Sequence, residues 1–126
     1  MNIIVKGALV SAIAAFAFTQ AAQAAGDVSR GKTAFSTCQV CHTNTKGGPN
    51  GLGPNLFGVV GRKAASLPGF YYSPALKSSG ITWTNDKLTA WIANPYKTVP
   101  GNRMAFPGIS DPAKVADIVA YLDTLK

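Results

Sequence analysis

The chain has 126 residues, a formal net charge of +7, two cysteines and one histidine. This length suits one domain, and the cysteines and histidine are too few for the four ligands of a structural zinc site. The basic residues are spread singly and do not alternate with aromatic residues, which argues against a nucleic-acid-binding surface. We take the charge to favour solubility and attraction to acidic protein surfaces.

Residues 1–24 are predicted to be a secretory signal peptide. Residues 1–6 carry one positive charge, residues 7–18 are apolar, and Ala22-Gln23-Ala24 matches a cleavage site. The apolar run of about 12 residues is shorter than the ~20 that span a membrane, although an uncleaved anchor is the alternative. We therefore expect a periplasmic domain of residues 25–126 with a net charge of about +6, without stable membrane insertion.

Three helices are predicted before residue 95. Asp27 is an N-cap for a helix over about 28–38, in which Gly31 indicates close approach of another helix. Residues 43–61 are rich in Gly, Pro and Asn and are expected to form an ordered loop.

Ser73 and Pro74 begin a short helix that Gly80 ends. Thr84 caps a helix over about 85–93, which ends because Pro95 restricts the residue before it.

The C-terminal part is predicted to be a loop followed by one long helix. Residues 95–110 contain three prolines and two glycines, so we expect a loop there. Asp111 as N-cap and Pro112 as first residue begin a helix that runs to about Leu125. It carries an apolar stripe of Val115, Ile118, Val119, Leu122 and Leu125, with Tyr121 beside it. No alternating strand pattern occurs, so the fold class is all-α, with long loops that need something packed inside them.

Both cysteines and the histidine lie in one short motif, Cys38-Gln39-Val40-Cys41-His42. C-x-x-C-H is the pattern of covalent c-type haem attachment. On a helix, positions i, i+3 and i+4 share one face, so two thiols and one imidazole would point the same way. The thiols could add to the two vinyl groups of a haem while the imidazole binds the iron. One motif predicts one haem per chain.

Other readings of this motif fit the sequence less well. Zinc lacks a fourth ligand, and a thioredoxin-like redox dithiol would need a βαβ surrounding that is not predicted here. A simple disulfide between Cys38 and Cys41 would leave the adjacent His42 without a role. Each stays open as an alternative.

The mature sequence resembles a class I, mitochondrial-type cytochrome c. The resemblance rests on GxxxF at 31–35, CQVCH at 38–42, GPNLFGVVGRK at 53–63, PGFYYSPALKSSGITW at 68–83, NP at 94–95, PGNRMAFPGI at 100–109 and the terminal AYL. These motifs in this order are far more specific than C-x-x-C-H alone. The resemblance implies four to five helices with long loops wrapped around one haem, and N- and C-terminal helices that cross.

The resemblance also implies a role for each matching residue. Cys38 and Cys41 would form the thioethers, His42 would be the proximal iron ligand and Met104 the distal one. Pro54 resembles the proline whose carbonyl accepts the ring N–H of His42. The remaining expected haem contacts are Arg62, Tyr72 and Trp83 around the propionates and Phe106 at the exposed haem edge.

The chain also departs from the family pattern. Trp91 stands where a tyrosine is common, Leu76 where an asparagine is common, and Asn102 where a threonine is common. Leu76 has no hydrogen-bonding group and Trp91 can only donate, so we predict a drier haem pocket than usual. Thr37 replaces a common interface lysine, so details of partner docking are not carried over.

The function predicted from these features is electron transport, not catalysis. A His/Met pair closes both axial positions of the iron, which leaves one-electron exchange at the haem edge. We expect a monomer that docks on acidic surfaces of a quinol–cytochrome c oxidoreductase and a terminal oxidase, or of photosynthetic redox proteins. An enzyme with an open iron site, such as a peroxidase, and a subunit of a larger dehydrogenase are the two alternatives.

Overall fold

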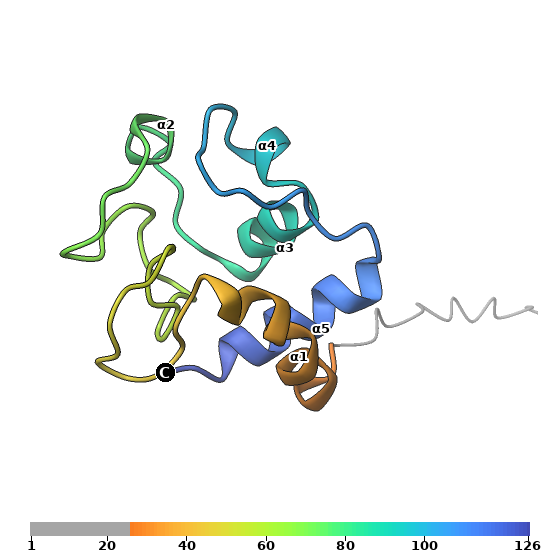
Figure 1. The fold of residues 1–126 in the computed structure, drawn as a ribbon. Helices are drawn as coiled ribbons and strands as arrows, with labels where there is room; N and C mark the ends of the chain where they lie inside the picture. The colour runs from red at the N-terminus through yellow and green to blue at the C-terminus, as the bar shows by residue number, and fades with distance from the viewer. Residues whose placement is uncertain (1–25) are drawn as a thin grey trace, which may run out of the picture.

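The structure, a computed structural model, describes residues 26–126, and the predicted signal peptide lies outside them. The described residues form five α-helices and one 3-10 helix, without a strand and with one isolated bridge between Lys63 and Thr82. The elements are α1 (Val28–Ala34), η1 (Phe35–Val40), α2 (Pro74–Lys77), α3 (Asn85–Ala93), α4 (Pro95–Thr98) and α5 (Pro112–Asp123). The all-α prediction is confirmed (Figure 1). None of the helices in this part of the chain has the length and apolar character needed to cross a membrane.

The predicted N-caps are all observed. Each cap side chain accepts a hydrogen bond from a backbone N–H in the first turn of its helix, which satisfies a donor that the helix leaves unpaired. The four caps are Asp27 of α1, Ser73 of α2, Thr84 of α3 and Asp111 of α5. The start of each helix is therefore determined locally, as the sequence indicates.

Two predicted elements differ from the structure. The first helix is α-helical only to Ala34 and continues as a 3-10 helix. The prediction missed this change because hydrophobic spacing does not distinguish the two hydrogen-bonding patterns. The predicted loop over 95–110 begins with the one-turn helix α4. Asn94 caps this helix by accepting from Lys97 N–H, and Pro95 occupies its first turn. The Asn-Pro pair thus ends α3 and also starts α4.

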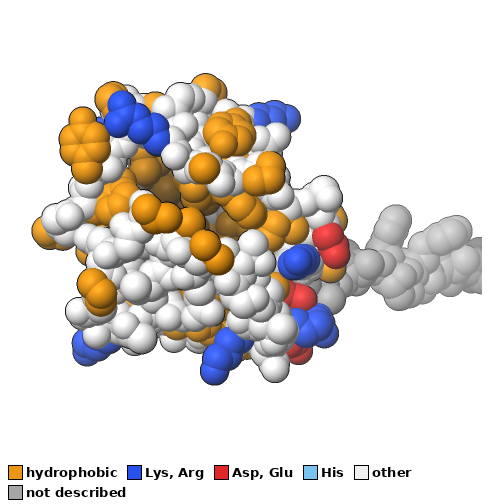
Figure 2. All heavy atoms as spheres, viewed as in Figure 1, with side chains coloured by type: hydrophobic (Ala, Val, Ile, Leu, Met, Phe, Trp, Pro, Cys, Tyr) orange, Lys and Arg blue, Asp and Glu red, His pale blue; other side chains and the backbone are white. Residues whose placement is uncertain are grey.

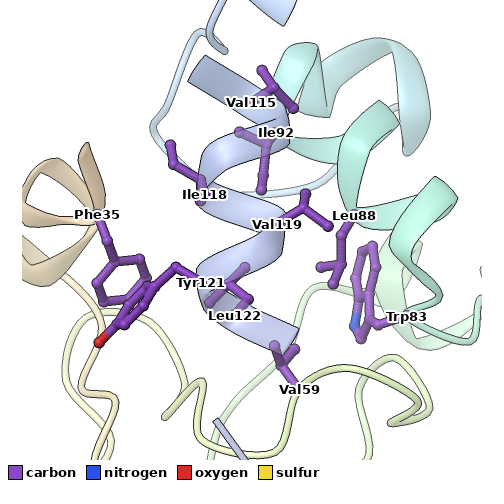
Figure 3. Close-up of a cluster of buried hydrophobic side chains, with 10 residues drawn as sticks. All are labelled: Phe35, Val59, Trp83, Leu88, Ile92, Val115, Ile118, Val119, Tyr121 and Leu122. Carbon is purple, nitrogen blue, oxygen red and sulfur yellow. The ribbon is translucent and has the colours of Figure 1, made fainter. Parts of the chain in front are cut away.

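The N- and C-terminal helices cross in close contact. A methyl group on Gly31 of α1 would overlap the backbone carbonyl of Asp117 on α5, so only glycine allows this approach. Below the crossing, the rings of Phe35 and Tyr121 pack with centroids 5.3 Å apart (Figure 3). An ion pair joins Arg30 to Asp117, whose carboxylate also accepts the backbone N–H of Asp27.

The hydrophobic core forms where α5 meets α3 and the loops. Figure 3 shows the side chains of α5 reaching toward α3 and toward Phe35. The buried cluster consists of Phe35, Val59, Trp83, Leu88, Ile92, Val115, Ile118, Val119, Tyr121 and Leu122. Four members of the predicted stripe on the last helix are buried, and Leu125, beyond the end of α5, is half-buried.

The long loops are ordered by hydrogen bonds to distant residues. Asn55 is buried; its side-chain amide donates to the carbonyls of Thr45 and Gly48, and its side-chain oxygen accepts from Phe57 N–H. Farther along, Gly58 N–H donates to the carbonyl of Leu125 at 2.7 Å. These bonds fix the loops around one face of the molecule, where the candidate site lies.

Candidate functional site

The face of the molecule viewed in Figure 1 is hollowed. Figure 2 shows hydrophobic side chains around and beneath the hollow, and in Figure 1 the segment after η1 and the loop after α4 lie on different sides of it. Several apolar residues that pack against the core stay half-buried, namely Cys38, Leu56, Val60, Leu76, Ile81, Trp91 and Ile109. An apolar surface left open to this extent indicates a site for an apolar group.

The two cysteines are held close together at the end of η1. Cys38 lies within the 3-10 helix and Cys41 caps it, and the N–H groups of Cys41 and His42 both donate to the carbonyl of Cys38. Because a 3-10 helix has three residues per turn, side chains at i and i+3 lie on the same side. Both thiols are half-buried and unbonded, so they are available for thioether formation.

The alternative readings of the motif are not supported. Burial raises the pKa of the Cys38 thiol, whereas a redox-active dithiol needs a lowered pKa. No βαβ unit surrounds the cysteines in residues 26–126. The same residues contain no cluster of three or more His, Cys, Asp or Glu side chains arranged to hold a metal.

His42 is held in one orientation by two neighbours in the loop. Its Nδ1 lies 2.7 Å from the carbonyl oxygen of Pro54, so Nδ1–H donates and the lone pair of Nε2 stays free for a metal. Burial lowers the pKa of His42, which favours the neutral imidazole that a metal binds. The ring also lies against Gly53, where a Cβ would overlap the imidazole atoms.

The role of Gly53 was not predicted from the sequence. The sequence shows only that this glycine directly precedes Pro54. The structure adds that Gly53 is not among the glycines with a positive φ, so it is not needed for a left-handed turn. A glycine without that conformational reason indicates close approach of another group. Here the group is the imidazole of His42.

Arg62 is a half-buried cation that forms no ion pair with an acidic residue of the described chain. Its guanidinium donates to the carbonyls of Asn55, at 2.9 Å, and Phe57. Burial lowers its pKa, and nearby Tyr72 partly offsets this effect. A partly desolvated positive charge with only neutral partners is suited to an anion such as a carboxylate.

Two buried aromatic residues carry hydrogen atoms that could serve the same anion. Tyr72 is 6% exposed, and its oxygen accepts from Leu67 N–H at 3.3 Å, which leaves its own O–H hydrogen to donate. Trp83 is buried against Trp91, with ring centroids 5.2 Å apart, and its indole N–H makes no hydrogen bond within residues 26–126. Both residues thus keep a donor that no other group in residues 26–126 uses.

Met104 lies on the loop after α4 and is fixed through its backbone. Its N–H donates to Oδ1 of Asn102 at 2.9 Å, and its carbonyl accepts from the hydroxyl of Tyr96 at 3.0 Å and from Phe106 N–H. The side chains of Met104 and Phe106 are half-buried. Farther along, Gly108 packs against α3 at a φ of 104°.

The residues at this site fit a covalently attached haem. Two adjacent thiols, a neutral imidazole with a free Nε2 and an apolar hollow match the tethers, the iron and the porphyrin. The cation of Arg62 and the free donors of Tyr72 and Trp83 match acidic propionates.

Known proteins are similar to this chain in both sequence and fold. A family model described as Cytochrome c matches residues 28–126. The chain belongs to the cytochrome c family. A cytochrome c2 of Rhodopila globiformis is 53% identical over 102 residues, which are 80% of this chain and 95% of that protein. A cytochrome c2 of Rhodomicrobium vannielii is 42% identical over 120 residues, 95% of this chain and 94% of that protein.

A solved structure supports the same family assignment. The structure of cytochrome cH from Methylobacterium extorquens aligns with a TM-score of 0.74 and 53% identity, over 79% of this chain and 99% of that one. Proteins of the cytochrome c family carry covalent haem c and transfer electrons. This cytochrome c is accordingly an electron carrier and not an enzyme.

Proposed function

We propose that this cytochrome c is a soluble periplasmic carrier of single electrons, with its haem iron bound by His42 and Met104. The hydrogen bond between His42 Nδ1 and the carbonyl of Pro54 is the observation that supports the proposal most directly. It places the proton on Nδ1, fixes the plane of the ring and leaves Nε2 as the ligand atom. Cys38 and Cys41, in the same short motif, would attach the haem covalently beside that imidazole.

Met104 supplies the second ligand in this proposal. Its backbone N–H and carbonyl are both hydrogen-bonded, so its side chain extends from a fixed point. A thioether is a soft ligand that favours ferrous iron and raises the reduction potential. With both axial positions filled by protein atoms, no position would remain for a substrate.

When bound, the haem supplies a one-electron couple between ferric and ferrous iron. The protein residues determine its surroundings. Arg62, Tyr72 and Trp83 would donate to the propionates, and Phe106 would cover part of the haem edge at which electrons enter and leave. Leu76 and Trp91 would keep the hollow apolar and dry, since neither side chain can accept a hydrogen bond.

Export by the N-terminal segment would bring the chain to the periplasm. Residues 1–24 have the charge, apolar run and cleavage motif of a signal peptide. The similarity to the Rhodomicrobium vannielii protein covers 120 residues and so extends into this segment. After cleavage, the domain would comprise residues 25–126.

The positive surface would guide this carrier to acidic partners. Lys32, Lys46, Lys97 and Arg103 are exposed, and we place them among the residues that meet acidic docking surfaces. A quinol–cytochrome c oxidoreductase would be the electron donor, and a terminal oxidase or a photosynthetic redox protein the acceptor. Their association should be transient and should weaken as salt rises.

Absorption spectra of the purified holoprotein test the ligation. We expect a weak charge-transfer band at the red edge of the oxidised spectrum, which reports an iron–sulfur bond, and no carbon monoxide binding by the reduced protein at neutral pH. Met104→Ala should keep the covalent haem, lose this band, lower the potential and bind carbon monoxide. A Met104→Ala protein with an unchanged band and potential would show that another residue fills the sixth position.

The same spectra separate the proposal from an enzyme with an open iron site. Ready carbon monoxide binding by the native reduced protein would favour that enzyme. Stable co-purification with a dehydrogenase would instead favour a dedicated subunit.

A further inference from the structure

We propose that Tyr96 is a positioning residue for Met104, and that helix α4 acts as a clamp on the loop that carries this ligand. The hydroxyl of Tyr96 donates to the carbonyl oxygen of Met104 at 3.0 Å, across eight residues of chain. The proposal rests on the ligation of iron by Met104 proposed above. Tyr96 would touch neither the iron nor the sulfur, and it would act only through the backbone of Met104.

The clamp needs a rigid support, and α4 is attached firmly to α3. Thr98 of α4 donates its hydroxyl to the carbonyls of Ala90 and Asn94, at 3.0 and 2.9 Å. Asn94 in turn caps α4 by accepting from Lys97 N–H. Because α3 packs on α5 through the core, the hydroxyl of Tyr96 is carried by a part of the fold that is also held by contacts outside the Met104 loop.

A second group of bonds holds the other side of Met104. Asn102 is buried, and its amide donates to the carbonyls of Pro95 and Val99 at the two ends of α4. The Oδ1 of the same side chain accepts the N–H of Met104. Both polar backbone groups of Met104 are therefore tied to α4, the N–H through Asn102 and the carbonyl through Tyr96.

These contacts give the clamp a measurable effect. An external ligand reaches the sixth position of the iron only when Met104 moves away, and moving the loop breaks the Tyr96 hydrogen bond. Removing that bond favours the open state by the net free energy of one hydrogen bond. Tyr96 is 48% exposed and water competes for the carbonyl, so we expect a shift of about two- to fivefold.

The test is a titration of the oxidised holoprotein with imidazole. Tyr96→Phe removes the hydroxyl and keeps the ring, and its apparent imidazole Kd should fall about two- to fivefold. Tyr71→Phe is the matched control, because Tyr71 is 76% exposed and its hydroxyl forms no hydrogen bond within the described residues. The ring of Tyr71 also lies beside Arg103, next to the same loop. This control should leave the Kd unchanged.

A second measurement separates positioning from general stability. Loss of the iron–sulfur band in denaturant should occur at a lower concentration in Tyr96→Phe than in the parent, while the loss of helical circular dichroism changes little. Equal imidazole affinity in Tyr96→Phe, Tyr71→Phe and the parent would overturn the clamp. If the parent itself lacks the iron–sulfur band, the proposed ligation fails instead, so the two failures are distinguishable.

Discussion

Gly31 of α1 lies directly against the backbone carbonyl of Asp117 on α5. The Cβ of any larger residue would overlap this carbonyl and crowd the side chain of Tyr121. The crossing of the terminal helices therefore depends on the absence of one side chain.

Gly31→Ala should destabilise the protein although alanine is the better helix former. We expect a loss of about 1–3 kcal/mol in the free energy of unfolding, because the helices must separate to admit the methyl group. Denaturant titration of the holoprotein measures it. Ser29→Ala, at an exposed position of the same helix, is the control and should change stability by less than about 0.5 kcal/mol. A Gly31→Ala protein as stable as this control would contradict the close approach.

Asp117 should make stability depend on pH in the acidic range. Its carboxylate accepts hydrogen bonds from the side chain of Arg30 and from Asp27 N–H, and these contacts lower its pKa below the ordinary value. The unfolded chain then binds the proton more tightly than the folded one. The stabilisation is complete above the unfolded pKa, near 4, and is lost as the pH falls through the lower folded pKa.

Asp117→Asn tests this dependence. The variant should be less stable than the parent at neutral pH, and the difference between the two should shrink as the pH falls below about 4. Denaturant midpoints between neutral and strongly acidic pH measure it. Asp86→Asn, at an exposed residue outside the ion pairs of the described chain, is the control and should lower the stability at neutral pH by less than Asp117→Asn does. A constant difference between Asp117→Asn and the parent at every pH would contradict the assignment.

Gly53→Ala should disturb His42, the proposed iron ligand, without changing any atom of its side chain. The added methyl group would overlap the imidazole of His42, so the ring must rotate or the loop must move. We expect weaker His42–Pro54 hydrogen bonding, a lower yield of haem-loaded protein and a shifted potential. Leu52→Ala, at a neighbouring side chain that is 83% exposed, is the control. An unaltered absorption spectrum, potential and yield in Gly53→Ala would show that Gly53 does not restrict the ring.

The charged residues near the Met104 loop should affect the rate of electron transfer to an acidic partner. Lys97→Gln and Arg103→Gln should each lower the second-order rate constant at low salt, and the difference from the parent should vanish at high salt. Lys126→Gln changes the net charge equally, at a residue that pairs with Asp123 near the C-terminus. Stopped-flow kinetics across ionic strengths should show a smaller effect for this control. Equal slowing by all three variants would mean that net charge alone guides association.

The parts of the fold that depend on neighbouring residues could be predicted from the sequence. The caps Asp27, Ser73, Thr84 and Asp111 act within one turn of helix, so their residue types suffice. The helix α4 was not predicted, because Pro95 indicates the end of α3 as well as the start of a new turn.

The site was predictable where a motif defines it and not where the fold brings distant residues together. CQVCH and the family motifs locate the tethers, the proposed ligands and Pro54. Contacts such as Gly53 with His42, or Tyr96 of α4 with Met104, join residues eight or more positions apart, and at least one residue of each pair lies in a loop without a period. Only the three-dimensional structure shows them.

The pairing of α1 with α5 also bears on when the haem can be attached. The helix α1 leads into η1, which contains Cys38 and is capped by Cys41, yet the main packing partner of α1 occupies residues 112–123 at the other end of the chain. Long-range contacts of this kind cannot form until the whole chain is available. While the chain is being made, the two thiols would thus remain accessible for haem attachment, and the fold would close only after the last segment has been made.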